Sequence, residues 1–531
     1  MANSSALEVC ERWRLRGNEA YEKGNLSRAE DCYTRGVKAV PCNEWSGCCL
    51  EPVVLCYSNR AATRMRSGRI RDGLKDCLNA IALDPNFLKA QVRAANCHLL
   101  LGEIEDALQY FSKCGESGGY VCLDRRIILE AADGLQKAKK VAECTRKCVE
   151  LLRQQTLHAA SNALAIIHEA LSLSSHSEIL LQMKGKALVR LQKYKEVIQL
   201  CEQTLSFAER NFPMVDAGKK LLYMNGSQSK VDPSVKLWRW HLMSRSYFHL
   251  GELEVALNLI KEQELLRSSE EKYQNNIHGA SLLFAATIHK LLHYEDEGKK
   301  AFHRGKYREA IKHFTAAISS NTESHPFTAI CFYNRASSLQ AMGQVAEAIA
   351  DCNLAIAIDG NCLKAIYQRA ALFETVRDYE QAASDLKRFI STLEKKLQDK
   401  GSPGSPTGSN MEELKRASSY LYSVEEKAKQ GTLLDLYLIL GVKASDSSVQ
   451  IKKAYRESVL RHHPDKVASK FVEESGGDKQ LWNEIADEIR KNAGKVYRMI
   501  ADAYEELSDP KKRSVYDLKL EVRNARDCSR G

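Results

Sequence analysis

The chain has few of the residues that interrupt helices: its 531 residues include only 10 prolines and 29 glycines. It also lacks any sustained alternation of apolar and polar residues, which argues against an extended half-buried β-sheet. Hydrophobic residues make up 44% of the chain, enough for packed cores. Because the chain is several times the usual domain length, several units or one long solenoid are expected. We therefore predict an all-α protein.

No stretch approaches 18 uninterrupted apolar residues, the length of a membrane-spanning helix. The N-terminus also lacks the basic segment and apolar run of a secretory signal. These absences predict a soluble protein of the cytoplasm or nucleus with no membrane partner. Disulfides are rare there, so the 17 cysteines are read as reduced core residues. Cys32, Cys77 and Cys352 fit this reading, because each falls on a periodic apolar helix position.

Signals for catalysis, metal binding and nucleic-acid binding are missing as well. The cysteines between 42 and 56 lack the paired CxxC spacing of zinc sites. No HExxH, Gly-x-Ser-x-Gly or phosphate-loop motif is present. The formal net charge of +10 is spread along the chain, without a basic block interleaved with aromatic residues. We expect no enzyme, no cofactor and no metal, and nucleic-acid binding through dispersed basic faces is the weakest alternative.

What the sequence does contain is a repeat. Gly68 and Gly102 are 34 residues apart, and Gly343 and Arg377 show the same spacing. This is the period of the tetratricopeptide helix-turn-helix repeat. Small residues let the two helices of a unit approach closely, and the glycines fall in the turns between them. The repeats are expected to stack into a superhelical solenoid with a concave, peptide-binding inner surface.

The repeats divide the chain into segments. We predict a first tetratricopeptide block at 8–119, a divergent middle block at 120–290, a second clear block at 291–395, a linker with a short helix at 396–432, and a C-terminal domain at 433–523. An extra loop is expected at about 41–52 in the first block. The linker prediction rests on the glycine, serine and proline residues of 401–410, which cannot bury apolar area.

The C-terminal domain contains a short basic turn, His463-Pro464-Asp465, after a predicted amphipathic helix. Ser447 and Gln450 have capping-box spacing at the start of this helix. The predicted buried stripe consists of Val449, Ile451, Ala454, Tyr455, Val459 and His462. Pro464 disfavours the helical conformation at the residue before it, so the chain must turn there and display His463 and Asp465.

Several segments flank this turn in a fixed order. They are Asp435-Leu436-Tyr437, Leu440-Gly441-Val442, Ile451 to Arg456, Ala503 to Pro510 and Lys512 to Asp517. With the turn, they resemble the J domain of DnaJ-type co-chaperones over roughly residues 433–520. The resemblance implies a four-helix unit that docks on a seventy-kilodalton heat-shock chaperone and stimulates its ATP hydrolysis.

The same resemblance implies roles for individual residues. His463, Pro464 and Asp465 would activate the partner's ATPase. The docking residues would be Lys452, Lys453, Tyr455, Arg456 and Lys466. Glu457 and His462 depart from the family, which commonly has a basic and an aromatic residue at these positions. The stretch between Asp465 and a third helix expected near Tyr497 is also unusually long, and we assign it no role.

In the first block, polar side chains on three successive first helices are expected to converge on the inner groove. They are Arg14, Asn18, Asn59, Lys89 and Arg93. A peptide C-terminal carboxylate there would receive charge-assisted hydrogen bonds. The pattern resembles the dicarboxylate clamp by which some tetratricopeptide domains hold the acidic C-termini of seventy- and ninety-kilodalton heat-shock chaperones. Arg14 departs from the lysine usual in the family.

The corresponding positions of the second block differ. They read Glu295, Lys299, Asn334, Lys364 and Gln368. A carboxylate replaces one cation and glutamine replaces the final arginine, while Arg369 points about 100° away around the helix. A second clamp is therefore not expected. The candidates for this block are another peptide sequence, a substrate polypeptide or no ligand.

Together these features predict a co-chaperone that assists protein folding or client transfer. Its repeats would bind chaperone tails, and its J domain would stimulate a seventy-kilodalton chaperone. The alternative is a passive tetratricopeptide scaffold with a silent J domain. Client polypeptides are expected partners, but the sequence does not identify them.

Overall fold

The computed structural model describes residues 2–40, 50–117, 125–212, 232–268, 277–320, 323–399, 408–431, 433–467, 469 and 479–528. The predicted loop at 41–52 and the linker at 401–410 lie largely outside these residues. The described part of the chain contains helices and no strand, which confirms the all-α prediction. It divides into two compact units, Met1–Ser246 with Asn258–Gln274, and Tyr247–Leu257 with Asn275–Gly531. The division falls inside the predicted middle block.

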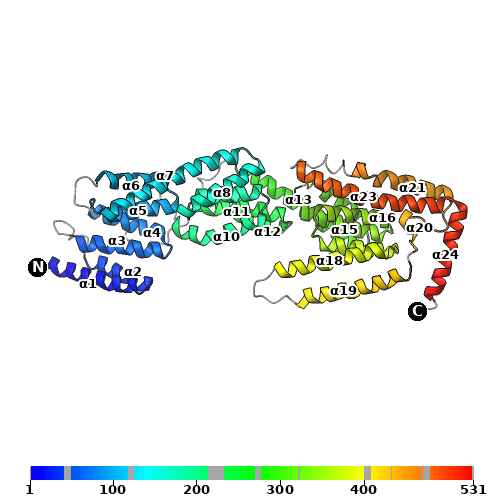
Figure 1. Cartoon of the computed structure of the whole chain (residues 1–531), viewed down its shortest axis with the longest axis horizontal. Helices are drawn as coiled ribbons and strands as arrows, with labels where there is room; N and C mark the ends of the chain where they lie inside the picture. Colours follow the sequence, from blue (N-terminus) through cyan, green and yellow to red (C-terminus); the bar gives the residue numbers. More distant parts are fainter. Residues whose placement is uncertain are drawn as a thin grey trace. The chain divides into compact units, whose positions relative to one another are not determined.

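The first unit is built from antiparallel helix pairs (Figure 1). Its helices are α1 (Ala2–Glu22), α2 (Leu26–Lys38), α3 (Glu51–Arg66), α4 (Ile70–Leu83), α5 (Leu88–Leu101), α6 (Ile104–Ser117), α7 (Arg125–Arg153), α8 (Leu157–Leu173), α9 (Glu178–Arg190), α10 (Tyr194–Asn211) and α11 (Pro233–His249). Helix α12 (Leu253–Ser268) contributes to both units. From α1 to α10 each pair packs on the next, as expected of tetratricopeptide repeats.

Glycine permits the tight turns of the first block. Gly24, Gly68 and Gly102 have φ angles of 76°, 78° and 81°, a left-handed conformation that a side chain disfavours. Gly17 serves close packing instead, because a Cβ atom there would lie 2.5 Å from the Tyr33 ring. The predicted small residues therefore permit the tight turns and the close helix packing of the repeat.

The second unit contains the second block and the C-terminal domain. The block comprises α13 (Ile277–His303), α14 (Tyr307–Ser320), α15 (His325–Ala341), α16 (Val345–Ile358), α17 (Leu363–Thr375) and α18 (Tyr379–Asp399). Helix α19 (Gly408–Lys429) lies along α18 (Figure 1). The sequence placed this helix with the linker. In the structure Ala417 and Val424 are buried in the cores of the block, so α19 closes the end of the solenoid.

The C-terminal domain comprises α20 (Leu436–Leu440), α21 (Ser448–His462), α23 (Lys479–Ser508) and α24 (Pro510–Cys528). The predicted capping box is present, with Ser447 and Gln450 bonded reciprocally. The third-helix start expected near Tyr497 is wrong, because α23 already begins at Lys479. An apolar stripe with Ile485 and Ile489 continues the helical period through the extra length and is buried, which stabilises these added turns.

The cysteine prediction agrees with the structure wherever it is described. The cysteines whose side chains the structure describes are all free and buried, and Cys32, Cys77 and Cys352 are among them. Cys42, Cys48 and Cys49 lie outside the described residues. In the described part of the chain, no helix is both long and apolar enough to cross a membrane.

Candidate functional site

The basic turn of the C-terminal domain is held over α23. His463 ends α21 with extended backbone angles of −62° and 120°, as expected before proline. Its ring meets the Tyr497 ring edge-on, with 6.0 Å between centroids. Arg490 Nε lies 3.4 Å from Asp465 Oδ1, yet the Asp465 side chain is 75% exposed. The turn is thus fixed by α23 while its carboxylate stays accessible to a partner.

A positive face extends from this turn along α21. Lys452, Lys453 and Arg456 are exposed and have no ion-pair partner within the described chain, and Lys466 after the turn is exposed as well. Tyr455 differs from these cations, because its ring stacks on Tyr504 with 3.9 Å between centroids. The predicted docking residues therefore form a basic surface, with Tyr455 supporting it from within the domain.

The buried stripe of α21 is shorter than predicted. Ile451 and His462 are buried, but Val449 is 75% exposed because it lies in the first turn, before the helix meets the rest of the domain. Burial lowers the pKa of His462 below its ordinary value, which favours the neutral ring at neutral pH. His462 Nε2 is buried without a hydrogen-bond partner among the described residues.

The first block brings several of the predicted clamp residues together. Asn18 on α1 accepts hydrogen bonds from Asn59 on α3, at 3.0 Å, and from the Tyr33 hydroxyl, at 2.8 Å. Arg93 on α5 donates to the backbone oxygen of Ser58, the neighbour of Asn59, at 2.6 Å. These bonds join the first helices of three successive repeats. They hold two amides and a guanidinium at one surface.

The remaining two clamp cations differ in whether they are paired within the chain. Lys89 is exposed and has no ion pair or hydrogen bond among the described residues. Arg14 is paired with Glu11, its Nε lying 2.7 Å from Oε2. The hydrogen bond from Arg14 lowers the pKa of Glu11 below its ordinary value. A ligand carboxylate at Arg14 would therefore compete with the charged Glu11 carboxylate.

Among the matching positions of the second block, Glu295, Lys299 and Gln368 are paired within the chain, Lys364 is exposed, and Asn334 Nδ2 is buried without a hydrogen-bond partner among the described residues. Lys299 Nζ lies 2.6 Å from Glu295, which neutralises the cation. Gln368 lies within hydrogen-bonding distance of Ser337 and Gln340. A groove of about 700 Å³ nevertheless runs along this face, with Tyr333, Phe389 and Tyr367 among its lining. Its lining is mainly apolar and aromatic, unlike the polar surface of the first block.

Arg369 is directed away from this groove, as the helical spacing predicts. It donates to both carboxylate oxygens of Asp385, at 2.7 and 2.6 Å. Equivalent bidentate pairs join Arg60 to Asp76 and Arg335 to Asp351. These pairs were not predicted from the sequence, although in each the aspartate follows the arginine by 16 residues. They connect the two helices of a repeat.

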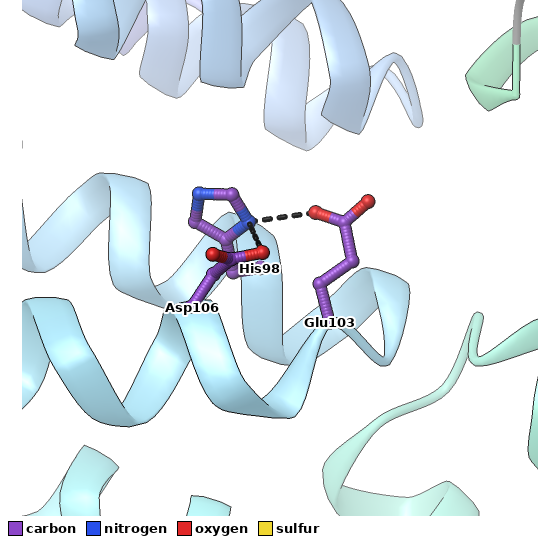
Figure 2. A group of neighbouring side chains, drawn as sticks. All are labelled: His98, Glu103 and Asp106. Atoms are coloured by element: carbon purple, nitrogen blue, oxygen red, sulfur yellow. Dashed lines mark hydrogen bonds and ion pairs between the residues drawn. The ribbon is translucent and has the colours of Figure 1, made fainter.

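One further cluster joins α5 to α6 (Figure 2). His98 Nδ1 lies 2.6 Å from Glu103 Oε2 and 3.9 Å from Asp106 Oδ2. The three ligand atoms lie close enough to hold a metal ion. Burial raises the pKa of Glu103, but hydrogen bonds from His98 and Arg71 outweigh it and lower the pKa. Because Arg71 already supplies a positive charge 2.5 Å from Glu103, we interpret the cluster as a link between helices.

Comparison with known proteins agrees with both parts of this architecture. A DnaJ domain model matches residues 435–479, and a tetratricopeptide repeat model matches 59–117 and 296–361. The crystal structure of the P58(IPK) TPR domain has a TM-score of 0.54 at 15% identity, covering 77% of this chain and 98% of that one. The chain is therefore a tetratricopeptide-repeat protein with a DnaJ, or J, domain near its C-terminus.

The chain also matches two DnaJ homologs over most of their length. DnaJ homolog subfamily C member 7 of Homo sapiens is 24% identical over 515 residues, which cover 97% of this chain and 87% of the relative. The DnaJ homolog subfamily C member 7 homolog of Dictyostelium discoideum is 26% identical over 513 residues, covering 96% and 79%. This chain is similar to both along its repeats and its J domain.

Proposed function

We propose that this protein is a co-chaperone whose J domain stimulates ATP hydrolysis by a seventy-kilodalton heat-shock chaperone. The observation that carries the proposal is the exposed Asp465 carboxylate beside the unpaired cations of α21, within a segment that matches the DnaJ domain. A positive face of this kind attracts an acidic partner surface and raises the rate of encounter. The chain itself performs no chemistry, because the ATP is bound and hydrolysed by the partner.

The decisive experiment is single-turnover ATP hydrolysis by a purified seventy-kilodalton chaperone with the full-length protein. The wild type should accelerate hydrolysis, and His463→Gln should abolish the acceleration because the turn loses its ring. His289→Gln is the matched control, since His289 is exposed on α13 and remote in sequence from the turn. A wild type without effect, or a His463→Gln variant with full effect, would favour the passive scaffold.

The first block supplies the second half of the proposed function. Asn18, Asn59, Lys89 and Arg93 present donors for the C-terminal carboxylates of a chaperone tail. Binding of such a tail would raise the concentration of the J domain near its target, to the millimolar range if the geometry allows both contacts. Tail capture and ATPase stimulation would then act on one partner or pass a client between two.

The tail site is tested by titrating a labelled peptide that ends in acidic residues. Lys89→Ala should weaken binding, and amidation of the peptide C-terminus should do the same. Lys139→Ala, an exposed change on α7, is the control. If both the variant and the amidated peptide bind like the unmodified pair, the first block is no carboxylate clamp.

A further inference from the structure

The J domain shares a hydrophobic core with the second tetratricopeptide block. Helix α16 packs against both α20 and α23. Ala346 and Ile349 of α16 are buried in one cluster with Ile439, Val496 and Ile500 of the J domain. A backbone hydrogen bond of 3.0 Å from Asp435 N to the oxygen of Val376 fixes the entry of the chain into α20. The two parts thus meet through packed side chains.

The added turns of α23 extend this contact. Ile485, Ala486 and Ile489 are buried and pack with Leu354 and Ala357 of α16. These turns belong to the insertion for which no role was predicted. Their apolar stripe packs on the tetratricopeptide block as well as on Val467 of the J domain, so the insertion serves as a docking seam.

An ion pair crosses the junction at Arg461, near the end of α21 and two residues before the turn begins at His463. Arg461 Nη1 lies 3.1 Å from Glu347 Oε1 of α16. The second partner of Arg461, Glu457, is on its own helix and lies 3.5 Å away. Glu347, Arg461 and His462 line one cleft of about 590 Å³, and His462 is buried there. Glu347 therefore fixes the last turn of α21 from outside the J domain.

Docking does not cover the surface that would face a chaperone. Lys452, Lys453 and Arg456 stay exposed, and so does Asp465. The contact with α16 instead involves α20, α23 and the end of α21. A docked arrangement that leaves this surface open orients the J domain without blocking it.

We infer that Glu347 of the tetratricopeptide block is a positioning residue for the His463-Pro464-Asp465 turn. The inference rests on the proposed stimulation of a seventy-kilodalton chaperone. The basic face of α21 sets the affinity for that partner, and Glu347 sets the direction in which the turn meets it. Loss of Glu347 should therefore reduce the maximal stimulated rate more than the apparent affinity.

The test uses the full-length protein and measures stimulated single-turnover hydrolysis over a range of co-chaperone concentrations. Glu347→Arg should lower the maximal stimulated rate about two- to fivefold, the range of a partly exposed ion pair, with a half-saturating concentration within twofold of wild type. The double variant Glu347→Arg with Arg461→Glu should recover at least half of the loss. Glu394→Arg, an exposed charge reversal on α18, is the control. An unchanged maximal rate, or no recovery in the double variant, overturns the inference.

Amide hydrogen exchange tests the docking separately from activity. Ala357→Asp places a charge in the seam and should speed exchange in residues 485–500, while exchange in α18 stays as in wild type. Ala371→Asp, on the groove side of α17, should leave residues 485–500 unchanged. Equal exchange in wild type and Ala357→Asp would show that the seam is not formed. A wild type that stimulates no hydrolysis refutes the proposed function, and the exchange result still decides whether the J domain is docked.

Discussion

The two clear tetratricopeptide blocks have different grooves but the same arginine–aspartate pairs between the helices of a repeat, called the frame below. Both contain an arginine bonded to a buried aspartate 16 residues later, Arg60 with Asp76 and Arg335 with Asp351. In the first block the groove offers an exposed lysine and an arginine that reaches the neighbouring helix. In the second, Lys364 is exposed as well, but Gln368 stands at the position of Arg93 and Lys299 is paired with Glu295. The repeat therefore specifies how helices pack, and a few groove residues specify what the block can bind.

The blocks also differ in what packs against the second helices of their repeats. In the second block, α16 carries the J domain, so one face of the block holds a groove and another holds a domain. Contact with the J domain does not depend on the residues at the clamp positions. The block has a structural role that does not require a bound peptide.

Breaking the shared frame should have the largest effect in either block. Arg60→Ala and Arg335→Ala each leave a buried aspartate without its main partner, and the expected loss is about 3–5 kcal/mol of unfolding free energy. Hydrogen exchange, read separately in the two blocks, measures each loss. Arg12→Ala and Arg304→Ala are controls, because both arginines are exposed. Comparable losses in the two blocks would show that the frame is common to them, whereas a loss in one block only would contradict this.

Removing the groove cation should weaken peptide binding, whereas the matching change in the second block should not. Arg93→Ala is expected to weaken binding of an acidic peptide C-terminus by about 10- to 100-fold, since a charge-assisted hydrogen bond contributes about 1.5–3 kcal/mol. Gln368→Ala at the matching position should not change the affinity. Calorimetric titration of the full-length protein measures both. Equal weakening by the two variants would place the peptide in the second block as well.

The junction at α16 should make the second block sensitive to acid. His462 has a lowered pKa in the folded protein, chiefly from burial, with Glu347 and Asp351 opposing and Arg461 adding to the shift. Below a pH of about 6.5 the unfolded chain binds a proton that the folded chain resists, so stability present at neutral pH falls as the pH drops toward the folded pKa. Each unit of depression corresponds to about 1.4 kcal/mol.

Hydrogen exchange in α16 and α23 at pH values between 5 and 7.5, corrected for the intrinsic exchange rate, measures this loss. His462→Phe should reduce the pH dependence. The change His168→Phe is the comparison, because His168 lies in the first unit. A pH dependence that persists in full in His462→Phe would assign it to other groups.

The smallest expected effect concerns Arg14. Glu11→Gln removes the carboxylate that competes for this guanidinium, and the affinity for an acidic peptide C-terminus should rise about twofold, as for a partly exposed ion pair. Titrations of wild type and variant under identical salt conditions would detect the change. Asp31→Asn provides a control, since it alters an exposed ion pair on α2. A fall in affinity would mean that Glu11 orients Arg14 for binding.

The sequence predicted features that depend on local spacing. The 34-residue period, the capping box at Ser447 and the burial of Cys77 all follow from periodicity, and the structure contains each of them. Asn18 and Asn59, 41 residues apart, were expected to converge because stacked repeats align their first helices, and they are hydrogen-bonded. Where the repeat determines which residues lie close together, sequence spacing is sufficient to predict the contact.

Features that depend on a neighbour outside the repeat could not be predicted in this way. The early start of α23 is stabilised by burial against α16, a partner more than 100 residues away in the chain. The exposure of Val449 reflects where α21 first meets the domain, which the helical period alone does not reveal. The salt bridge between Glu347 and Arg461 joins residues that no repeat relates.

Helix α16 belongs to the core of its own repeat and to the core of the J domain. A chain that ended before residue 433 would keep α16 but leave Ala346, Ile349 and Leu354 without their J-domain contacts. Water-exposed apolar strips of this kind promote aggregation and are bound by chaperones. Loss of the J domain would thus leave the remaining protein with an exposed apolar surface and make it prone to aggregation.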